Sequence, residues 1–271
     1  MRSSAERVEI IAHRGMGQGR VQPDAPPENT LAAVRAAWEA GADAVEIDVR
    51  LTLDDELIVI HDATTDRTTG RSLRVAAARM EELRALSAGS WKGAAWACEK
   101  LPTLLEVLAT IPAGKRLFVE LKAGPEIVPA LVRAVAASGN APMQIAVISF
   151  NIDTMAAAKR ALPEVRCYLL MEFEADYQRG GWDVRYHAGA DFRTVRGPLD
   201  LDALISMVVG SGLDGMDASF CQPLSLAERA LAAGLELIAW TVNDAEIARS
   251  LVAHGIRSIT TDRPALLTRR A

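Results

Sequence analysis

The sequence predicts a closed (β/α)₈ barrel with a small insertion between its second and third barrel strands. Short β-branched runs alternate with Ala- and Leu-rich amphipathic segments along almost all of the 271 residues. This alternation is typical of a parallel sheet whose strands are joined by right-handed helical crossovers. Eight such strands in a chain of this length favour a closed barrel over an open doubly wound sheet.

Helical stretches separate most of the predicted strands. In the first of them, residues 29–43, Leu31, Val34 and Trp38 share one face and Gly41 ends the helix. The same pattern recurs at residues 153–165, 225–235 and 244–256. The predicted barrel strands are residues 8–12, 44–51, 117–122, 145–150, 166–171, 215–218, 235–242 and 258–261.

Residues 52–101 interrupt this rhythm and form the predicted insertion. They contain a short strand at 57–60 and a helix near 79–86. Residues 172–199, rich in Gly, Asp and Arg, are predicted to be a second long loop on the same face. Such segments lie over the C-terminal mouth of a barrel, where the active sites of these folds are found. No interdomain linker is evident, so residues 1–271 are interpreted as one domain.

The composition limits the classes of partner and the compartment. Half of the residues are hydrophobic, which is enough for a large core. The net charge of -5 argues against nucleic acid or an anionic membrane as the main partner. Three distant cysteines form neither a disulfide framework nor a zinc site, which favours a reduced, cytoplasmic setting. We expect no signal peptide and no membrane-spanning segment, because no apolar run approaches about 18 residues. The oligomeric state is left open.

The second and third predicted strands carry charged residues on the face that should point into the barrel. Along the second strand, Glu46, Asp48 and Arg50 alternate with apolar residues. Along the third, Glu120 and Lys122 do the same. Side chains alternate between the two faces of a strand, so these groups should meet inside the barrel near its mouth.

Three carboxylates in one desolvated space need a compensating positive charge. A hard divalent cation, Mg²⁺ or Ca²⁺, would supply it, because these ions prefer carboxylate oxygens. Glu46, Asp48 and Glu120 are therefore the predicted metal ligands. The alternative is an internal ion-pair network in which Arg50 and Lys122 balance the same carboxylates.

Two of the four histidines lie just after predicted strands. His13 follows the first strand and His61 follows the short strand of the insertion. Histidine both accepts and donates protons near neutral pH, so the two are candidates for a general acid and a general base. His254 is interpreted as a helix-end residue. His187 is left unassigned and is expected to face solvent.

Four further residues are candidates for binding the substrate. Arg14 and Lys122 would place fixed positive charge beside the metal, which suits a phosphate better than a neutral ester. Asn29 has two open roles, one in the site and one as a helix N-cap. Trp240 ends the seventh strand, where its ring would contact substrate or plug the barrel.

These residues lie within an ordered set of motifs that resembles the glycerophosphodiester phosphodiesterase family. The resemblance extends over nearly the whole chain, and the family is a (β/α)₈ barrel with a small insertion after the second strand. The motifs are "AHRG", "PENT", "GADAVEIDVRLTLDDELIVIHDATTDRTT", "LPTLLEVL", "FVELK", "ISFN", "AWTVND" and "ITTDRP".

The resemblance implies roles for the same residues. Its metal ligands would be Glu46, Asp48 and Glu120, its acid–base pair His13 and His61, its phosphate contacts Arg14 and Lys122, and Asn29 would help to order the site. The implied activity is hydrolysis of small glycerophosphodiesters to glycerol 3-phosphate and an alcohol such as choline or ethanolamine.

Two alternatives remain open at this point. One is a lysophospholipase D or sphingomyelinase D-like activity on an acylated substrate, which an apolar surface around the mouth would favour. Trp91, Trp96, Phe173 and Trp182 are the residues that could form that surface. The other is a non-catalytic binding module, although no predicted ligand or histidine is missing.

Overall fold

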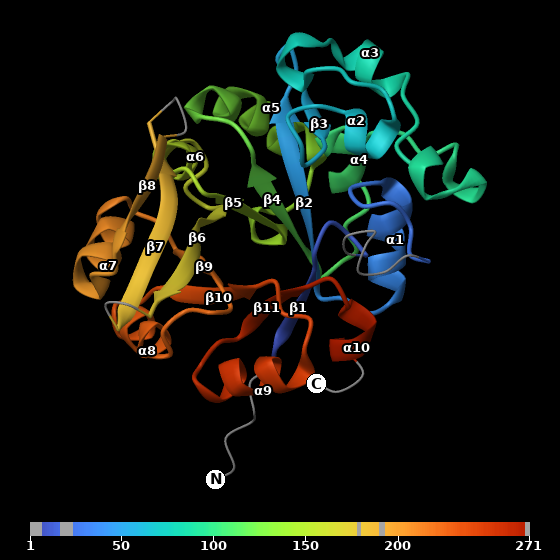
Figure 1. Ribbon diagram of the computed structural model, residues 1–271. Coiled ribbons are helices and arrows are strands. Elements are labelled where there is room, and N and C mark those ends of the chain that lie inside the picture. The colour runs from blue at the N-terminus through green and yellow to red at the C-terminus, as the bar shows by residue number, and fades with distance from the viewer. Residues whose placement is uncertain (1–6, 17–23, 178–179, 190–192, 269–271) are drawn as a thin grey trace.

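The computed structural model describes residues 7–16, 24–177, 180–189 and 193–268, which form a closed barrel of eight parallel strands surrounded by helices (Figure 1). The strands pair in the order β5-β4-β2-β1-β11-β10-β9-β6, and a β5–β6 pairing closes the ring. This confirms the predicted fold. The barrel strands are β1 (Glu9–Ala12), β2 (Ala44–Leu51), β4 (Arg116–Leu121), β5 (Ile145–Ser149), β6 (Arg166–Asp176), β9 (Gly215–Ser219), β10 (Glu236–Trp240) and β11 (Ser258–Thr261).

Helices on the outside of the barrel follow the strands in the expected order. In α1, the side chain of Thr30 caps the N-terminus by accepting a hydrogen bond from the Ala33 amide, and Gly41 with φ of 87° lies just beyond the C-terminus. The helices of this layer are α1 (Leu31–Glu39), α4 (Leu104–Leu108), α5 (Val128–Ser138), α6 (Ile152–Ala161), α7 (Leu201–Gly210), α8 (Ser225–Ala232), α9 (Ala245–Ala253) and α10 (Pro264–Thr268).

The barrel strands bury both faces, and each face has its own core. Outward-facing residues such as Val45 and Ile47 pack beneath the helices in the large core cluster. Inward-facing residues form a smaller cluster that fills the lower barrel, including Phe118 and Tyr168, whose rings stack with centroids 6.1 Å apart. The apolar interior is therefore closed below the level at which the charged residues begin.

The predicted insertion between the second and third barrel strands is a small packed unit near the end of β2 (Figure 1). Its first strand pairs antiparallel with β2. Ile58, Leu83 and Leu101 belong to a separate apolar cluster that holds the unit together. Its elements are β3 (Leu57–Val59), α2 (Asp66–Thr69), α3 (Met80–Arg84), and the short 3₁₀ turns η1 (Val75–Ala77), η2 (Ser90–Lys92) and η3 (Ala94–Trp96). Two further turns, η4 (Pro125–Ile127) and η5 (Pro142–Gln144), lie within the barrel layer.

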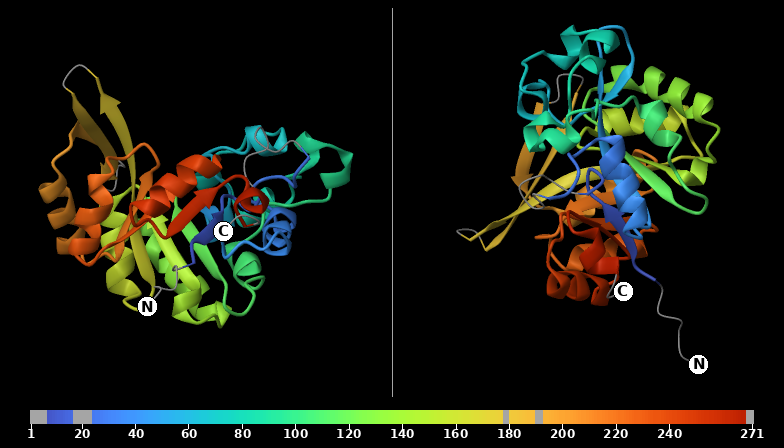
Figure 2. Two further views of the ribbon diagram at one scale, coloured as in Figure 1. Left: turned by 90° about the horizontal axis from the view of Figure 1, so that it is seen from below. Right: turned by 90° about the vertical axis from the view of Figure 1, so that its right-hand side faces the viewer.

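The prediction of a long loop at 172–199 is wrong. Strand β6 continues past the barrel and pairs antiparallel with β7 (Gly181–Ala188), which pairs in turn with β8 (Arg193–Pro198). The resulting antiparallel ribbon projects from the body of the molecule (Figure 2). The barrel strand thus supplies the first strand of the ribbon, and the ribbon begins beside the mouth.

The structure describes three free cysteines, Cys98, Cys167 and Cys221. Within the described residues, no helix is both long enough and apolar enough to cross a membrane. The ends of the predicted domain, residues 1–6 and 269–271, lie outside the described part of the chain.

Candidate active site

The three predicted metal ligands lie together inside the barrel. Glu46 and Asp48 come from β2 and Glu120 from β4, and the register of these strands places Asp48 directly beside Glu120. All three side chains are buried, and one oxygen from each lies within 4.8 Å of the others. Strand alternation, which put every second residue of β2 inside the barrel, therefore produces a compact oxygen-rich group.

Two basic residues balance only part of this negative charge. Nζ of Lys122 lies 3.1 Å from Oδ1 of Asp48 and 2.6 Å from Oε1 of Glu120. Nε of Arg14 lies 3.2 Å from Oδ2 of Asp48, but its guanidinium is shared with Glu28, 2.9 Å away. The three carboxylates are therefore balanced by the whole charge of Lys122 and by only part of the charge of Arg14.

The pKa values of the carboxyl groups follow from this imbalance. Burial raises the pKa of Glu46 well above its ordinary value, and the neighbouring carboxylates add to the effect. Burial also raises the pKa of Glu120 to about 7, although Lys122 opposes the shift. At Asp48 burial acts in the same direction, but Lys122 and Arg14 outweigh it and hold the pKa well below its usual range.

An unpartnered oxygen shows that the group fits a further cation. Oε2 of Glu46 accepts a hydrogen bond from the Arg14 amide at 2.9 Å. Oε1 of Glu46 is buried, and the described residues offer it no hydrogen-bond partner. A buried carboxylate oxygen without a partner is costly, and a hard cation among three carboxylates would satisfy it. The residues present therefore fit the predicted divalent metal.

Both candidate histidines have one ring nitrogen held by a carboxylate. Nδ1 of His13 lies 2.7 Å from Oδ1 of Asp262, and Nδ1 of His61 lies 2.7 Å from Oδ1 of Asp62. In each ring Nε2 is then the nitrogen left for proton exchange, and Nε2 of His13 is 3.9 Å from Glu46. Burial lowers the pKa of His61, and Lys122 and Arg14 lower it further against the attraction of Asp48.

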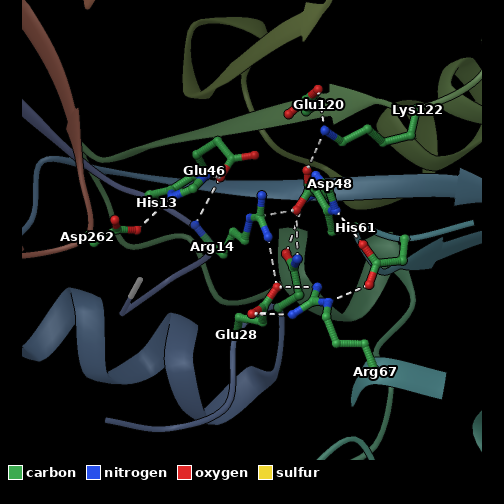
Figure 3. A network of polar contacts seen from close by, with 12 residues as sticks. His13, Arg14, Glu28, Glu46, Asp48, His61, Arg67, Glu120, Lys122 and Asp262 are labelled. Carbon is green, nitrogen blue, oxygen red and sulfur yellow. Dashed lines mark hydrogen bonds and ion pairs between the residues drawn. The ribbon is translucent and has the colours of Figure 1, made fainter. Parts of the chain in front are cut away.

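A chain of ion pairs connects the surroundings of the two histidines (Figure 3). Glu28 is buried and accepts hydrogen bonds from both Arg14 and Arg67. Arg67 also donates to Asp62, which holds His61. Glu28 therefore holds Arg14 at the cavity. It also holds Arg67, whose other partner, Asp62, positions His61.

Asn29 holds one of the three predicted metal ligands, and its alternative role as an N-cap is wrong. The cap of α1 is Thr30. Asn29, with φ of 59°, donates from its side-chain amide to Oδ2 of Asp48 at 2.7 Å and accepts from the Asp48 backbone amide at 3.2 Å. The unusual backbone angle at Asn29 accompanies this reach back to β2.

Trp240 lies at the mouth with its ring held from two sides. Its Nε1 donates to the backbone carbonyl of Asp217 at 3.0 Å, and its ring meets that of Phe150 edge-on with centroids 5.7 Å apart. Both rings of this aromatic pair belong to residues that line the cavity described below.

These groups surround one cavity of about 320 Å³ at the C-terminal end of the barrel. Its lining combines both candidate histidines, basic residues and two of the three predicted metal ligands with apolar and aromatic residues. The residues that line the cavity are His13, Arg14, Glu46, His61, Glu120, Lys122, Ile148, Phe150, Leu170, Glu172, Arg185, Asp217, Trp240, Thr241 and Thr260.

Four other predictions have mixed outcomes. In the described structure Arg50 forms no ion pair with a carboxylate; it donates to the backbone carbonyls of His61 and Lys122. The predicted ion-pair alternative is therefore wrong for Arg50, whereas Lys122 pairs as that alternative required. His187 lies on β7, half-buried, with its ring centroid 5.7 Å from that of Phe150, so it does not simply face solvent. His254 ends α9 as predicted.

Sequence reasoning assigned no role to four acidic residues that matter here. Glu28 and Asp62 stand in the motifs "PENT" and "IHDA", directly beside the assigned Asn29 and His61, and Asp262 stands in "TTDRP" just after the last predicted strand. Asp217, in β9, is buried in the cavity wall, and burial with the added effect of Glu120 raises its pKa well above the ordinary value. Its sequence signal is an acidic residue in the middle of a predicted strand.

The fold and the cavity place this protein among barrel enzymes that act on an anionic substrate. Residues 13–266 match the model of the glycerophosphoryl diester phosphodiesterase family. The chain is 31% identical over 268 residues, 95% of each protein, to the glycerophosphodiester phosphodiesterase of Caldanaerobacter subterraneus subsp. tengcongensis. It therefore belongs to this family of phosphoric diester hydrolases.

Solved structures show the same likeness. The protein resembles an Oleispira antarctica phosphodiesterase in complex with the product sn-glycerol-3-phosphate, with a TM-score of 0.78, 26% identity, and coverage of 96% of this chain and 95% of that one. It also resembles a glycerophosphodiester phosphodiesterase from Agrobacterium tumefaciens, with a TM-score of 0.71, 26% identity, and coverage of 97% and 99%.

Proposed function

We propose that this protein hydrolyses small glycerophosphodiesters to glycerol 3-phosphate and an alcohol, with a divalent metal and two histidines. The observation that carries the proposal is the pairing of His13 with Asp262 and of His61 with Asp62 at one cavity that also holds the acidic group. Membership of the family and the product bound to the Oleispira antarctica relative support it.

In this proposal Glu46, Asp48 and Glu120 hold Mg²⁺ or Ca²⁺. When bound, such an ion neutralises charge on a phosphate oxygen and makes a neighbouring hydroxyl more acidic. Asn29 keeps Asp48 in place, and Arg14 and Lys122, which line the cavity, contact the phosphate oxygens. Trp240 packs against the organic part of the substrate.

The two histidines move the protons. The attacking hydroxyl gives its proton to Nε2 of one histidine as its oxygen bonds to phosphorus. The bond from phosphorus to the alcohol oxygen breaks, and the other histidine protonates that oxygen. The partners Asp262 and Asp62 hold the rings in the tautomer that this exchange needs.

The attacking group is the substrate's own C2 hydroxyl of glycerol. None of the described residues that line the cavity is a serine or a cysteine. A hydroxyl adjacent to the phosphate has a very high effective concentration. The first stage then yields a cyclic glycerophosphate, which water opens in the second stage while the histidines exchange roles. Water bonds to phosphorus, the phosphorus bond to the C2 oxygen breaks, and that oxygen takes the proton.

A two-part assay tests the proposal. Purified protein is stripped of metal with a chelator, then titrated with Mg²⁺ or Ca²⁺ while glycerol 3-phosphate release from glycerophosphocholine is measured. We expect release only with added metal. Metal-dependent cleavage of lysophosphatidylcholine but not of glycerophosphocholine would favour the lysophospholipase D alternative. Binding of glycerophosphocholine without turnover would favour a non-catalytic module.

The structure offers the acylated-substrate alternative little support. Phe173 is buried, and none of Trp91, Trp96, Phe173 and Trp182 lines the cavity. A cytoplasmic location is part of the proposal and is supported by the three free cysteines. A small-molecule substrate, rather than nucleic acid or a membrane, agrees with the cavity of about 320 Å³.

A further inference from the structure

The floor of the cavity contains a carboxyl group that the proposed mechanism does not use. Asp217 in β9 lines the cavity, and only 2% of the residue is exposed. Its Oδ1 is buried and has no hydrogen-bond partner among the described residues. The backbone carbonyl of the same residue is occupied by the indole of Trp240, so the position is rigidly held.

The register of the strands shows how deep this group lies. In an eight-stranded barrel, inward-facing residues of alternate strands form layers of four. The pairings of the strands place Asp217 in one layer with Glu46, Ile148 and Thr260, and all four line the cavity. The next inward residues below them belong to the apolar cluster of Ile11, Phe118, Tyr168 and Ile238. The layer that contains Asp217 is therefore the floor of the cavity, closed from beneath by apolar side chains.

The proposed reaction determines which end of the substrate reaches this floor. The alcohol leaves in the first stage, whereas the glycerol part stays bound until water opens the ring. The departing alcohol must pass through the mouth, and water must enter behind it. The glycerol end therefore lies inward, with its phosphate beside Arg14 and Lys122. Its remaining terminal hydroxyl is the group that points to the floor.

We infer that the carboxyl group of Asp217 accepts a hydrogen bond from the terminal C1 hydroxyl of the substrate's glycerol and selects diesters in which this hydroxyl is free. The inference rests on the proposed function. A buried carboxyl oxygen without a partner favours a ligand that brings a hydrogen-bond donor, and a glycerol hydroxyl is a donor of the right size. An acyl group on that oxygen would remove the donor and would need room below a closed floor.

The test compares two substrates in two proteins. The substrates are glycerophosphocholine and its analogue with hydrogen in place of the C1 hydroxyl, which keeps the C2 hydroxyl. For the wild type we expect kcat/KM to fall about 10- to 100-fold with the analogue, because Asp217 then stays unpaired. For Asp217→Leu we expect the two substrates to react at nearly equal kcat/KM, because neither finds a partner at the floor. A substitution that only disturbs the structure would lower kcat/KM for both substrates alike and would leave their ratio unchanged.

Matched variants complete the design. Asp217→Asn keeps an acceptor of the same shape and should keep most of the preference for the C1 hydroxyl. Glu236→Gln changes a strand carboxylate that binds the Tyr168 hydroxyl outside the cavity, and should leave the ratio unchanged. If Asp217→Leu does not fold, Asp217→Ala, which removes the carboxyl group without adding bulk, takes its place in the comparison.

Each result has one meaning for the inference. Equal kcat/KM of the wild type for both substrates would overturn it while leaving the proposed function intact. An unchanged preference in a folded Asp217→Leu protein would do the same. No cleavage of glycerophosphocholine by the metal-loaded wild type would instead remove the proposed function, and the inference with it.

Discussion

Nδ1 of His13 lies 2.7 Å from Oδ1 of Asp262, although 249 positions separate the two residues in the chain. The contact exists because β1 and β11 are neighbours in the closed barrel, and His13 and Asp262 each follow the end of one of these strands. Asn243 holds the other oxygen of Asp262 at 2.7 Å, so the carboxylate is fixed from two sides. The closure of the barrel thus brings Asp262 to His13, one of the two candidate catalytic histidines.

The first prediction concerns this support. Asp262→Asn should lower kcat about 10²- to 10⁴-fold, because an amide no longer selects the ring tautomer that leaves Nε2 free to accept a proton. Steady-state rates with glycerophosphocholine measure the effect. Asp244→Asn is the control, since Asp244 caps α9 and asparagine caps equally well. A near wild-type rate for Asp262→Asn would show that the pairing has no part in proton transfer.

The second prediction concerns the acidic group. Glu120→Gln and Asp48→Asn should each weaken binding of Mg²⁺ or Ca²⁺ by more than about tenfold and abolish turnover, because a charged oxygen ligand is lost. Calorimetric titration measures the affinity directly, without reference to activity. Glu236→Gln should bind metal like the wild type. Unchanged affinity in both site variants, and in a Glu46→Gln variant, would mean that the group is an ion-pair network around Lys122.

The third prediction separates the two histidines. His13→Ala and His61→Ala should each lower kcat about 10²- to 10⁴-fold while metal affinity stays unchanged. A diester with a nitrophenol leaving group needs little help from a general acid. Its hydrolysis should therefore be restored in the variant that lacks the acid and remain slow in the variant that lacks the base. Restoration in neither variant would argue against a division of acid and base roles between them.

The strands and the residues that alternate along them could be predicted from the sequence. Glu46, Asp48 and Glu120 stand out because a charged side chain on the inner face of a buried strand is unusual. The partners Asp62, Asp262 and Glu28 could not be assigned, because their contacts depend on how loops meet around the mouth rather than on local periodicity. Asn29 was also open as a helix cap, because the sequence alone did not show that its neighbour Thr30 takes that role.

The antiparallel ribbon was missed for a different physical reason. Residues 172–199 are rich in Gly, Asp and Arg, and Gly and Asp are depleted in strands. The ribbon forms because β6 extends beyond the barrel, and Phe173 and Val184, which pair across it, are both buried. Cross-strand packing outweighs the weak local preference, and no short window of sequence contains both partners.

The fourth prediction concerns stability at acid pH. Burial opposes the charge of Glu28, but Arg67 and Arg14 outweigh it and lower its pKa below the ordinary value of 4.5. Ionised Glu28 therefore stabilises the fold fully above about pH 4.5, and this contribution is lost as the pH falls through the lowered pKa. Glu28→Gln removes one of the two carboxylates that pair with the buried Arg14 and should cost about 3 kcal/mol at pH 7.

Denaturant unfolding between pH 7 and pH 3 measures this difference. The free energies of unfolding of the wild type and Glu28→Gln should converge at the acid end of the range. Glu81→Gln, a change at an exposed carboxylate of α3, should follow the wild type throughout. A constant difference between Glu28→Gln and the wild type down to pH 3 would show that the charge of Glu28 is not the source of the effect.

The last prediction concerns the attacking hydroxyl. The cavity is lined by His13 and His61 as proton-transfer groups, and none of its described lining residues is a serine or a cysteine. The nucleophile is therefore taken to be the C2 hydroxyl of glycerol. An analogue of glycerophosphocholine with hydrogen at C2 should bind with similar affinity, because the phosphate contacts of Arg14 and Lys122 remain. Its alcohol should be released far more slowly, because the analogue lacks the neighbouring hydroxyl, which attacks phosphorus at a very high effective concentration. The analogue with hydrogen at C1 retains the nucleophile, so its loss should not exceed the about 10- to 100-fold expected from the unpaired Asp217, and the C2 analogue should react more slowly than it does. If the C2 analogue is hydrolysed at the rate of the parent substrate, water attacks phosphorus directly, and the same histidines then act on that water in a single stage.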